Sequence, residues 1–314
     1  MAENIKERLE KPHVCIRIFK DDLVVVTDEK GKLIDDIKIR HVLLAPLESK
    51  IADLMDENFV ELNVHDDQEK AVEVFKKYDR VALPVVDALG FLIGIVTVDD
   101  VLDVAEEEAT EDIQKLGGTE ALEEAYIDTT IVDMVKKRGK WLVFLFVGEM
   151  LTASAMGFFE NQISKAVVLA LFVPLIISSG GNSGSQAATL VIRAMSLGEI
   201  ALRDWWKVMK REIISGFFLG CILGSVGFLR IILWTAFSDI YGPHWFLIGL
   251  TVSGSLIGVV LWGTLTGSML PFIIRKFGGD PATSSAPFVA TLVDVVGIII
   301  YFGFAIFLLT GSLL

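Results

Sequence analysis

The sequence predicts an α-helical polytopic membrane domain of five transmembrane helices, preceded by a smaller cytosolic α/β domain. Composition divides the chain near residue 140: residues 1–140 hold 33 acidic and 19 basic side chains, whereas residues 141–314 hold 8 and 9. The first part contains an internal repeat of strand and helix signals. The second part is dominated by apolar residues and contains five runs long enough to cross a bilayer.

The acidic charge of the first part limits the partners of the chain. An acidic surface repels nucleic acid and anionic lipid headgroups, so we expect cations as partners and no nucleic acid; simple solubility is the other interpretation. Cys15 and Cys221 are too few and too far apart for a disulfide framework or a zinc site. The first 20 residues are charged and lack the apolar segment of a secretory signal, which predicts that this part stays in the cytosol.

A repeat with a constant offset of 59 residues organises the first part and relates residues 24–43 to residues 83–102. The matching positions include Asp28 and Asp87, Gly31 and Gly90, and Leu33 and Leu92. Each copy predicts a strand, a turn around the glycine, a second strand and the start of a helix. The second copy is complete, whereas the first is short at its N-terminus.

An acidic segment follows the repeat: residues 99–112 contain eight carboxylates in fourteen positions and no base. On a helix, Asp100, Asp103, Glu107 and Glu111 share one face, where like charges repel by a few tenths of a kcal/mol per pair. Such a face attracts a divalent cation, and hard oxygen ligands favour Mg2+ or Ca2+; a solvated helix face is the alternative. The segment leads through an amphipathic stretch at residues 127–138 into the first apolar run, so metal binding could bias the membrane domain.

Five apolar runs predict the transmembrane helices, at about 141–159, from 166, at 213–237, 245–274 and 286–309. Basic residues cluster before the first run, between the second and third, and after the fourth, while the opposite loops hold almost none. This distribution follows the positive-inside rule. It predicts a multi-pass protein of the cell (inner) membrane, with the N-terminus in the cytosol and the C-terminus outside.

The second apolar run meets Pro174 and then a small polar segment at residues 180–186, Gly-Gly-Asn-Ser-Gly-Ser-Gln. We expect a non-helical break there, buried in protein or lining a wet cavity, because unpaired backbone groups in hydrocarbon cost several kcal/mol each. Transport proteins use such breaks to present carbonyl groups to ions. A short loop at the cytosolic surface is the alternative.

Acidic residues within and beside the apolar runs indicate an ion pathway. Asp294 lies in the fifth run with no base nearby, where a carboxylate costs at least about 2.5 kcal/mol unless it faces water, a cation or a partner. Asp280 precedes the same run and is either an ion ligand or only a helix N-cap. Glu149 is a further intramembrane carboxylate, in the first run, but no motif surrounds it.

Two sets of motifs resemble known families. Residues 84–87 (Pro-Val-Val-Asp) and 94–100 (Gly-Ile-Val-Thr-Val-Asp-Asp) resemble the core of a CBS motif, a module that is normally paired. A second set of features resembles the MgtE magnesium transporter family. It comprises the domain order, Pro174 with the segment at 180–186, Met-Leu-Pro-Phe at 269–272, Asp-Pro-Ala at 280–282 and Ala-Thr-Leu-Val-Asp at 290–294. This resemblance covers about residues 24–314. It divides the chain into a partial first CBS motif at 1–46, a second at 47–105, an acidic linker and connecting helix at 106–140, and a pore domain at 141–314.

The resemblance to this family implies a homodimeric, Mg2+-selective channel rather than an enzyme, with its pore on the two-fold axis. Asp294 of each subunit would hold a largely hydrated Mg2+, with Asn182 and nearby backbone carbonyls around it. In the family, high cytosolic Mg2+ fills sensor sites and a connecting plug helix, here roughly residues 120–138, closes the pore. The sensor carboxylates carry over to Asp67, Glu69, Asp79, Asp100, Asp103, Glu108, Glu111 and Asp112, and at the membrane face to Asp280.

The CBS resemblance also implies an adenine nucleotide site. In that family a Gly-x-x-Thr-x-x-Asp turn holds an adenosine ribose, and Thr97 and Asp100 match it; a simple cap on the following helix is the alternative. The first copy departs from the pattern with Lys38 and His41. Family members usually carry an acidic N domain before the CBS pair, which this sequence lacks, so we expect a weaker Mg2+ inhibition that rests mainly on Asp103 to Asp112 and Asp280.

Other functions remain open at this point. A carrier that exchanges Mg2+ for Na+ or H+ would need further buried ionisable groups, for which Glu149 is the candidate. A membrane-anchored CBS nucleotide sensor would bind adenine nucleotides tightly and would not need Asp294. The ion site would also admit Mn2+, Co2+ or Ni2+. An enzyme is not favoured, because the four histidines are scattered outside the apolar runs and no nucleophile–base pair stands out.

Overall fold

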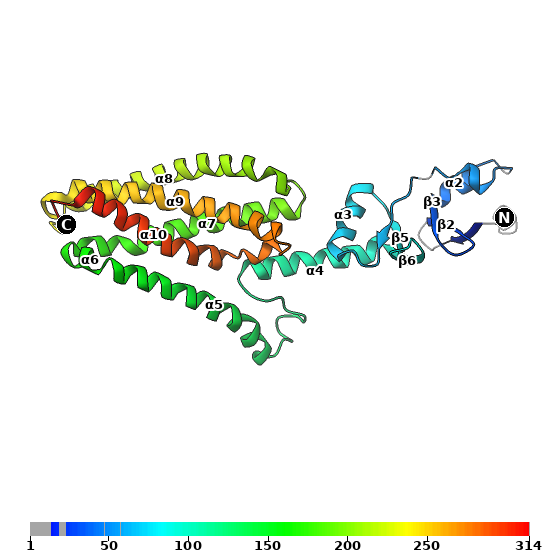
Figure 1. The fold of residues 1–314 in the computed structure, drawn as a ribbon, viewed down its shortest axis with the longest axis horizontal. Coiled ribbons are helices and arrows are strands. Elements are labelled where there is room, and N and C mark those ends of the chain that lie inside the picture. The colour runs from blue at the N-terminus through cyan, green and yellow to red at the C-terminus, as the bar shows by residue number, and fades with distance from the viewer. Residues whose placement is uncertain (1–13, 19–22, 47, 57, 314) are drawn as a thin grey trace. The chain divides into compact units, whose positions relative to one another are not determined.

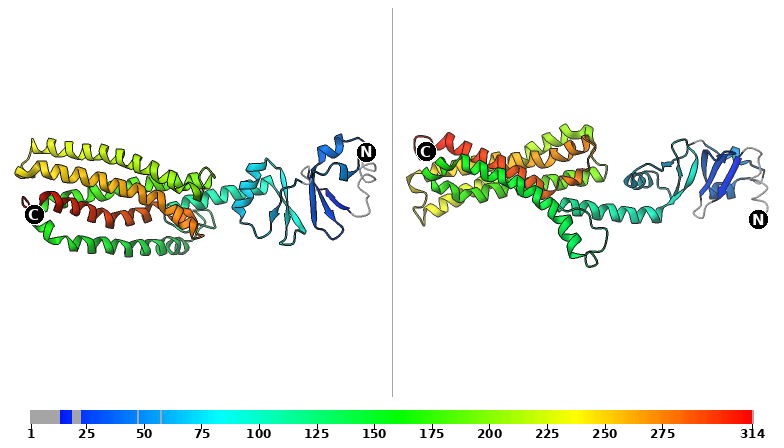
Figure 2. Two further views of the ribbon diagram at one scale, coloured as in Figure 1. Left: turned by 45° about the horizontal axis from the view of Figure 1, so that its top comes forward. Right: turned by 60° about the horizontal axis from the view of Figure 1, so that its bottom comes forward.

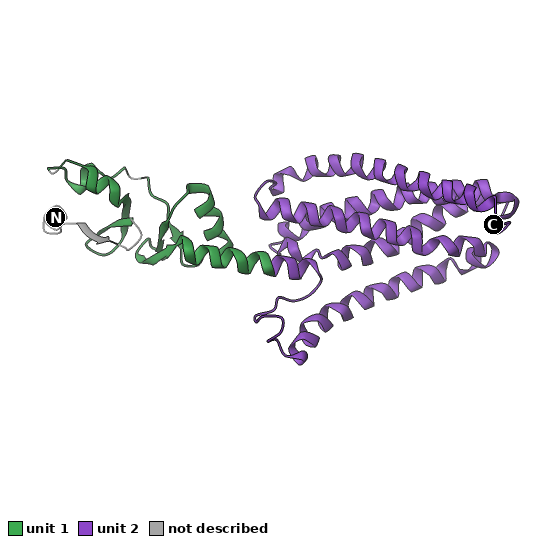
Figure 3. Ribbon diagram, turned by 180° about the vertical axis from the view of Figure 1, so that it is seen from behind, with its two compact units in different colours: residues 1–110 green, residues 111–314 purple. Residues whose placement is uncertain are grey.

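The computed structural model describes residues 14–18, 23–46, 48–56 and 58–313. These residues form two units, 1–110 and 111–314, coloured separately in Figure 3. Residues 111–140, although charged, therefore belong to the same unit as the membrane helices and not to the first unit. Parts of the predicted first CBS motif, at 1–13 and 19–22, lie outside the described residues.

Two three-stranded sheets form the first unit (Figure 1). In the first sheet, β1 (Val14–Ile18), β2 (Leu23–Asp28) and β3 (Leu33–Lys38) are antiparallel neighbours. In the second, β4 (Leu62–Asn63) runs parallel to β5 (Ala82–Val86), which is antiparallel to β6 (Leu92–Thr97). The helices of this unit are α2 (Ile39–Leu44), η1 (Ile51–Asp53), α3 (Gln68–Tyr78) and most of α4 (Val98–Leu116).

The 59-residue repeat is confirmed as a structural repeat. The side-chain oxygen Oδ1 of Asp28 accepts hydrogen bonds from the N–H groups two and four residues later, and Asp87 does the same at the equivalent turn, all at 2.8–2.9 Å. Gly31 and Gly90 adopt φ of +91° and +84°, which glycine tolerates without strain. The two turns also bond to each other, because the Leu33 N–H donates to the Gly90 carbonyl (3.0 Å) and the Leu92 N–H donates to the Gly31 carbonyl (2.9 Å).

One buried ion pair lies in the first unit, between Asp36 of β3 and Arg80, which precedes β5. The Asp36 carboxylate is fully buried and its Oδ2 lies 2.7 Å from the Arg80 guanidinium. Burial raises the pKa of Asp36, while the Arg80 charge acts in the opposite direction. Since an unpaired buried charge is costly, this contact fixes β3 against the start of the second repeat copy.

The second unit contains five helices that are long and apolar enough to cross a membrane, counted over the described residues. They are α5 (Ile131–Phe158), α7 (Val173–Ser196) with the preceding 3-10 turn η2 (Val167–Phe172), α8 (Trp205–Thr235) with η3 (Leu202–Asp204), α9 (Trp245–Lys276) with η4 (Gly242–His244), and α10 (Ala286–Leu309). The short helices α6 (Glu160–Lys165) and η5 (Pro281–Thr283) connect them. The predicted number of spans is confirmed.

The helix α9 is central to the bundle and α5 lies at its edge. Half of the most apolar stretch of α9 is buried inside the chain, against 6% of that of α5. In Figure 1 and the left view of Figure 2, α8 and α5 lie on opposite sides of α9 and α10. Aromatic contacts hold α5 to α10, including Trp141 and Phe144 on Phe288, and Phe159 stacked on Phe302. One face of α5 thus packs on α10, and most of its surface is left uncovered.

The expected break at residues 180–186 is wrong, because this segment is helical within α7. Its glycines lie where α7 crosses α9. A Cβ added to Gly263 or Gly267 of α9 would collide with the backbone carbonyl of Gly180 or Gly184, respectively. Two Gly-x-x-x-Gly pairs therefore let the two backbones touch, as small residues do between membrane helices. The close packing offsets the low helix propensity of this segment.

The expected connecting helix over roughly 120–138 is wrong in its first part. Helix α4 ends at Leu116, and the next helix, α5, begins only at Ile131. Gly118 terminates α4 in a Schellman arrangement: its φ is +73°, and the Thr119 N–H donates to the Gln114 carbonyl. Thr130 caps α5 by accepting from the Asp133 N–H (3.2 Å). Residues 131–138 are helical, as the first turns of α5.

Candidate ion site in the membrane unit

The candidate ion site is built around Asp294, which is half-buried on α10 inside the helix bundle. Helix α7 lies against it: a Cβ added to Gly181 would be 3.9 Å from Asp294 Oδ1. The neighbouring Asn182 is exposed, and its amide lies 3.4 Å from the Ser178 hydroxyl. Asp294 and the polar segment of α7 thus meet at one level of the bundle, although neither helix is broken there.

A row of polar residues runs along the exposed face of α7. Its members recur every three or four residues and are Ser178, Asn182, Gln186, Thr189 and Arg193, all exposed in the single chain. Polar side chains at membrane depth almost always face a protein interior or a water-filled cavity, because hydrocarbon cannot hydrogen-bond to them. This face is therefore unsuited to lipid, and it begins next to the candidate ion site.

A second carboxylate, Glu149 of α5, lies beside Asp294. The carboxyl groups of Glu149 and Asp294 are within hydrogen-bonding reach of each other, and the Thr291 hydroxyl lies 3.3 Å from Glu149 Oε1. The sequence marks Glu149 as an intramembrane acid, but only the packing of α5 on α10 places it here. Thr291 was not singled out; its position one helical turn before Asp294 is the signal that could have identified it.

Asp280 forms the helix cap that was one of its two interpretations, and it also pairs with a lysine; its role as an ion ligand stays a prediction. Its Oδ1 caps η5 by accepting from the Ala282 N–H (2.8 Å), while its Oδ2 lies 2.7 Å from the Lys115 ammonium group. Lys115, in the last turn of α4, also pairs with Glu111. Partial burial alone would lower the pKa of Lys115, but these two carboxylates outweigh it and raise the pKa above its ordinary value. Sequence analysis missed Lys115, whose i, i+4 spacing from Glu111 is the available signal.

The other predicted sensor carboxylates are dispersed. Asp67 caps α3 by accepting from the Glu69 N–H (3.1 Å), and Asp79 ends that helix with φ +47°. Glu108 accepts a hydrogen bond from the Gln68 side chain (2.5 Å), and Asp103 is exposed. Among the described residues, no three His, Cys, Asp or Glu side chains converge as they would around a metal ion. The sensor assignment, including Asp112, therefore stays a prediction.

Thr97 and Asp100 contact each other, and the Asp100 carboxylate also accepts from the Thr97 N–H (3.4 Å), which is one half of a capping box. The Thr97 hydroxyl donates to Asp100 Oδ2 (2.7 Å) at the start of α4. A ribose bound by both side chains would have to replace this hydrogen bond. The nucleotide site stays a prediction.

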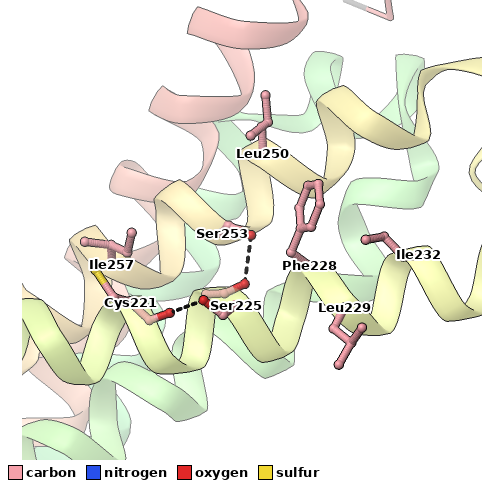
Figure 4. A pocket seen from close by; sticks show the side chains of 9 residues that line it. Cys221, Ser225, Phe228, Leu229, Ile232, Leu250, Ser253 and Ile257 are labelled. Atoms are coloured by element: carbon pink, nitrogen blue, oxygen red, sulfur yellow. Dashed lines mark hydrogen bonds between the residues drawn. The ribbon is translucent and has the colours of Figure 1, made fainter.

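A hollow of about 480 Å³ on the surface of α8 and α9 is separate from these residues. Cys221, Ser225, Phe228, Leu250 and Ser253 line much of it, as Figure 4 shows. The Ser225 hydroxyl donates to the Cys221 carbonyl of its own helix, and the Ser253 hydroxyl of α9 donates to the Gly224 carbonyl of α8. The hollow is mainly apolar and contributes no acidic ligand.

Comparisons with known proteins agree with this architecture. A family model described as a divalent cation transporter, MgtE, matches residues 173–304, and a CBS domain model matches residues 51–107. The chain is 40% identical over 286 residues to the magnesium transporter MgtE of Thermus thermophilus, covering 91% of this chain and 62% of that protein. The corresponding protein of Bacillus subtilis is 31% identical over 280 residues, with 89% and 60% covered.

The chain thus spans about three fifths of the length of these curated relatives. A solved structure described as the cytosolic domain of the Mg2+ channel MgtE in complex with ATP is 40% identical, covering 27% of this chain and 34% of that chain with a TM-score of 0.27. The soluble part of a magnesium transporter is 37% identical, covering 29% and 35% with a TM-score of 0.28.

Proposed function

Because this chain belongs to the MgtE family of divalent cation transporters, we propose that it moves Mg2+ across a membrane along a path that passes Asp294. The observation that carries the proposal is the half-buried Asp294 carboxylate on a membrane helix. In the part of the chain that the structure describes, it forms no ion pair with a lysine or arginine. A cation in transit supplies the missing opposite charge.

The chemistry of Mg2+ suits a site of this kind. Mg2+ gives up its water reluctantly and is usually held by one or two carboxylates, with several waters retained, rather than by a closed cage of protein ligands. One Asp294 per subunit supplies charge to a hydrated ion without replacing its full shell. The amide of Asn182 and the polar face of α7 can hydrogen-bond to the retained waters.

We also propose that the functional unit is a homodimer with the pore between the two copies. The row Ser178, Asn182, Gln186, Thr189 and Arg193 is exposed in the single chain, and a second copy facing it would enclose a polar path. The edge helix α5 leaves further apolar surface for a partner or for lipid. The positive-inside distribution of basic residues orients the chain with its N-terminus in the cytosol.

Mg2+ uptake by the purified protein in liposomes tests the proposal. We expect uptake driven by a membrane potential alone, with Na+ and H+ at equal concentrations on both sides, because an open ion path needs no exchanged ion. Internal Mg2+ is followed with a fluorescent indicator, and protein-free liposomes are the control. Uptake that requires a Na+ or H+ gradient would instead favour a coupled carrier, and none under any gradient would reject Mg2+ transport.

Cytosolic Mg2+ is proposed to close the path through the carboxylates at the end of α4 and Asp280. Replacing Asp103, Glu108, Glu111 and Asp112 together with their amides is expected to raise the Mg2+ concentration needed for closure by roughly tenfold, because each change removes a cation-binding charge. Flux is measured against Mg2+ on the cytosolic side. The control exchanges Glu61 and Glu73, which are exposed and lie outside the acidic segment, for glutamine. An unchanged closure curve in the fourfold variant would leave these residues as a solvated helix face.

A further inference from the structure

The contact between α5 and α10 contains one acidic level, formed by Glu149 of α5 and Asp294 of α10. Above and below it the contact is aromatic, through Trp141 and Phe144 on one side and Phe159 on the other. Between them lies Gly148, whose added Cβ would collide with the Thr291 side chain, so the two helices approach closely at this point. The next residue along α5 is Glu149, and its carboxyl group reaches Asp294.

The two adjacent carboxylates have no compensating base. Over the described chain, neither Glu149 nor Asp294 pairs with a lysine or arginine. Glu149 contacts a neutral polar side chain, the Thr291 hydroxyl. One turn further along α5, the Thr152 hydroxyl is buried without a hydrogen-bond partner. Two like charges at membrane depth repel each other and are each costly to desolvate, so their juxtaposition stabilises the fold less than an apolar pair would.

We propose that Glu149 is a specificity-determining residue of the ion path, supplying a second negative charge per subunit beside Asp294 that favours divalent over monovalent cations. This inference rests on the proposed transport function. Coulomb attraction scales with the charge of the ion, so an added carboxylate stabilises Mg2+ twice as strongly as Na+ or K+ at the same distance. Glu149 need not touch the ion, because retained waters lie between a hydrated Mg2+ and its ligands.

Glu149 lies on α5, the least buried of the five spanning helices of the described chain. Most of α5 is uncovered, and its contact with the bundle is the single face on α10. The Thr291 hydroxyl, 3.3 Å from Glu149 Oε1, is a polar contact between the two helices at this point. Glu149 thus lies on a sparsely packed helix, whereas Asp294 lies between α7 and α5 on a well-packed one.

Glu149→Gln in the full chain tests the inference, with Mg2+ and Na+ fluxes measured in the same liposomes. The expected result is a fall of roughly tenfold in the Mg2+ to Na+ flux ratio, because one of two neighbouring charges is removed in a partly buried site. Glu149→Asp keeps the charge and is expected to keep the ratio close to that of the unmodified chain. Glu160→Gln removes an exposed carboxylate beyond the end of α5 and is the control, expected to leave the ratio unchanged.

The outcomes separate this inference from the proposed function. If Asp294→Asn loses Mg2+ flux while Glu149→Gln keeps the unmodified flux ratio, transport through Asp294 stands and the role of Glu149 is rejected. Equal losses of the Mg2+ and Na+ fluxes in Glu149→Gln would reduce Glu149 to a packing residue. If Asp294→Asn transports normally, the proposed path itself fails. Thermal stability of each purified variant identifies any that does not fold; if Glu149→Gln is such a variant, Glu149→Ala, which also removes the charge, carries the test by its flux ratio.

Discussion

Replacing Asp294 with asparagine is expected to lower Mg2+ flux into liposomes by roughly a hundredfold or more, because the amide removes the charge that offsets moving a divalent cation to membrane depth. Asparagine has nearly the same shape as aspartate, so the helix packing around Gly181 is retained. The loss should therefore appear in flux and not in protein yield. The initial rate of Mg2+ uptake, measured with an indicator inside the liposomes, gives the comparison.

The matched control is Asp239→Asn, which makes the same chemical change at an exposed position outside the spanning helices and should leave the rate unchanged. Asp294→Ala separates charge from shape, since it removes both and is expected to be no more active than Asp294→Asn. Normal uptake by both Asp294 variants would show that the ion takes another path. Asp294 would then contribute to helix packing and not to ion transport.

The membrane half of the fold follows from local patterns because bilayer thickness fixes the length of each apolar run. The last span is predicted at residues 286–309 and α10 has these bounds. The first unit is predictable for a different reason. Its two turns are each held by an aspartate side chain, Asp28 or Asp87, and they repeat at a fixed offset in the sequence. Both signals are visible in the sequence itself, as one continuous apolar run or as two matching segments, so no knowledge of the tertiary structure is needed.

The contacts of the candidate ion site could not be predicted in the same way, because they depend on helices far apart in the sequence. Glu149 and Asp294 are brought together by the fit of Gly148 against Thr291, and no local pattern in α5 indicates that register. The connector differs, since its structure has local causes. The glycine Gly118 ends α4 and Thr130 caps α5, and they bound a segment that the family resemblance implied was helical.

The continuous α7 helix depends on a contact that can be tested directly at Gly267. Replacing Gly267 with alanine is expected to destabilise the membrane unit by about 3 kcal/mol or more, at the upper end of the cost of overpacking, because the new Cβ would collide with the Gly184 backbone and not with a movable side chain. The backbones of α7 and α9 would have to separate, which also displaces Gly181 from Asp294. We expect a lower melting temperature, lower yield and reduced Mg2+ flux.

Gly303→Ala on α10 is the matched control, because it also introduces a single methyl group into a membrane helix but at a position with no atom within 4 Å. Alanine has the higher helix propensity, so this variant should be as stable as the unmodified chain or slightly more so. If Gly267→Ala melts at the same temperature as Gly303→Ala, then α7 and α9 do not pack at backbone contact, and the segment at 180–186 would be free to open as its composition indicates. If only Gly267→Ala loses stability, the segment at 180–186 is helical because it packs on α9.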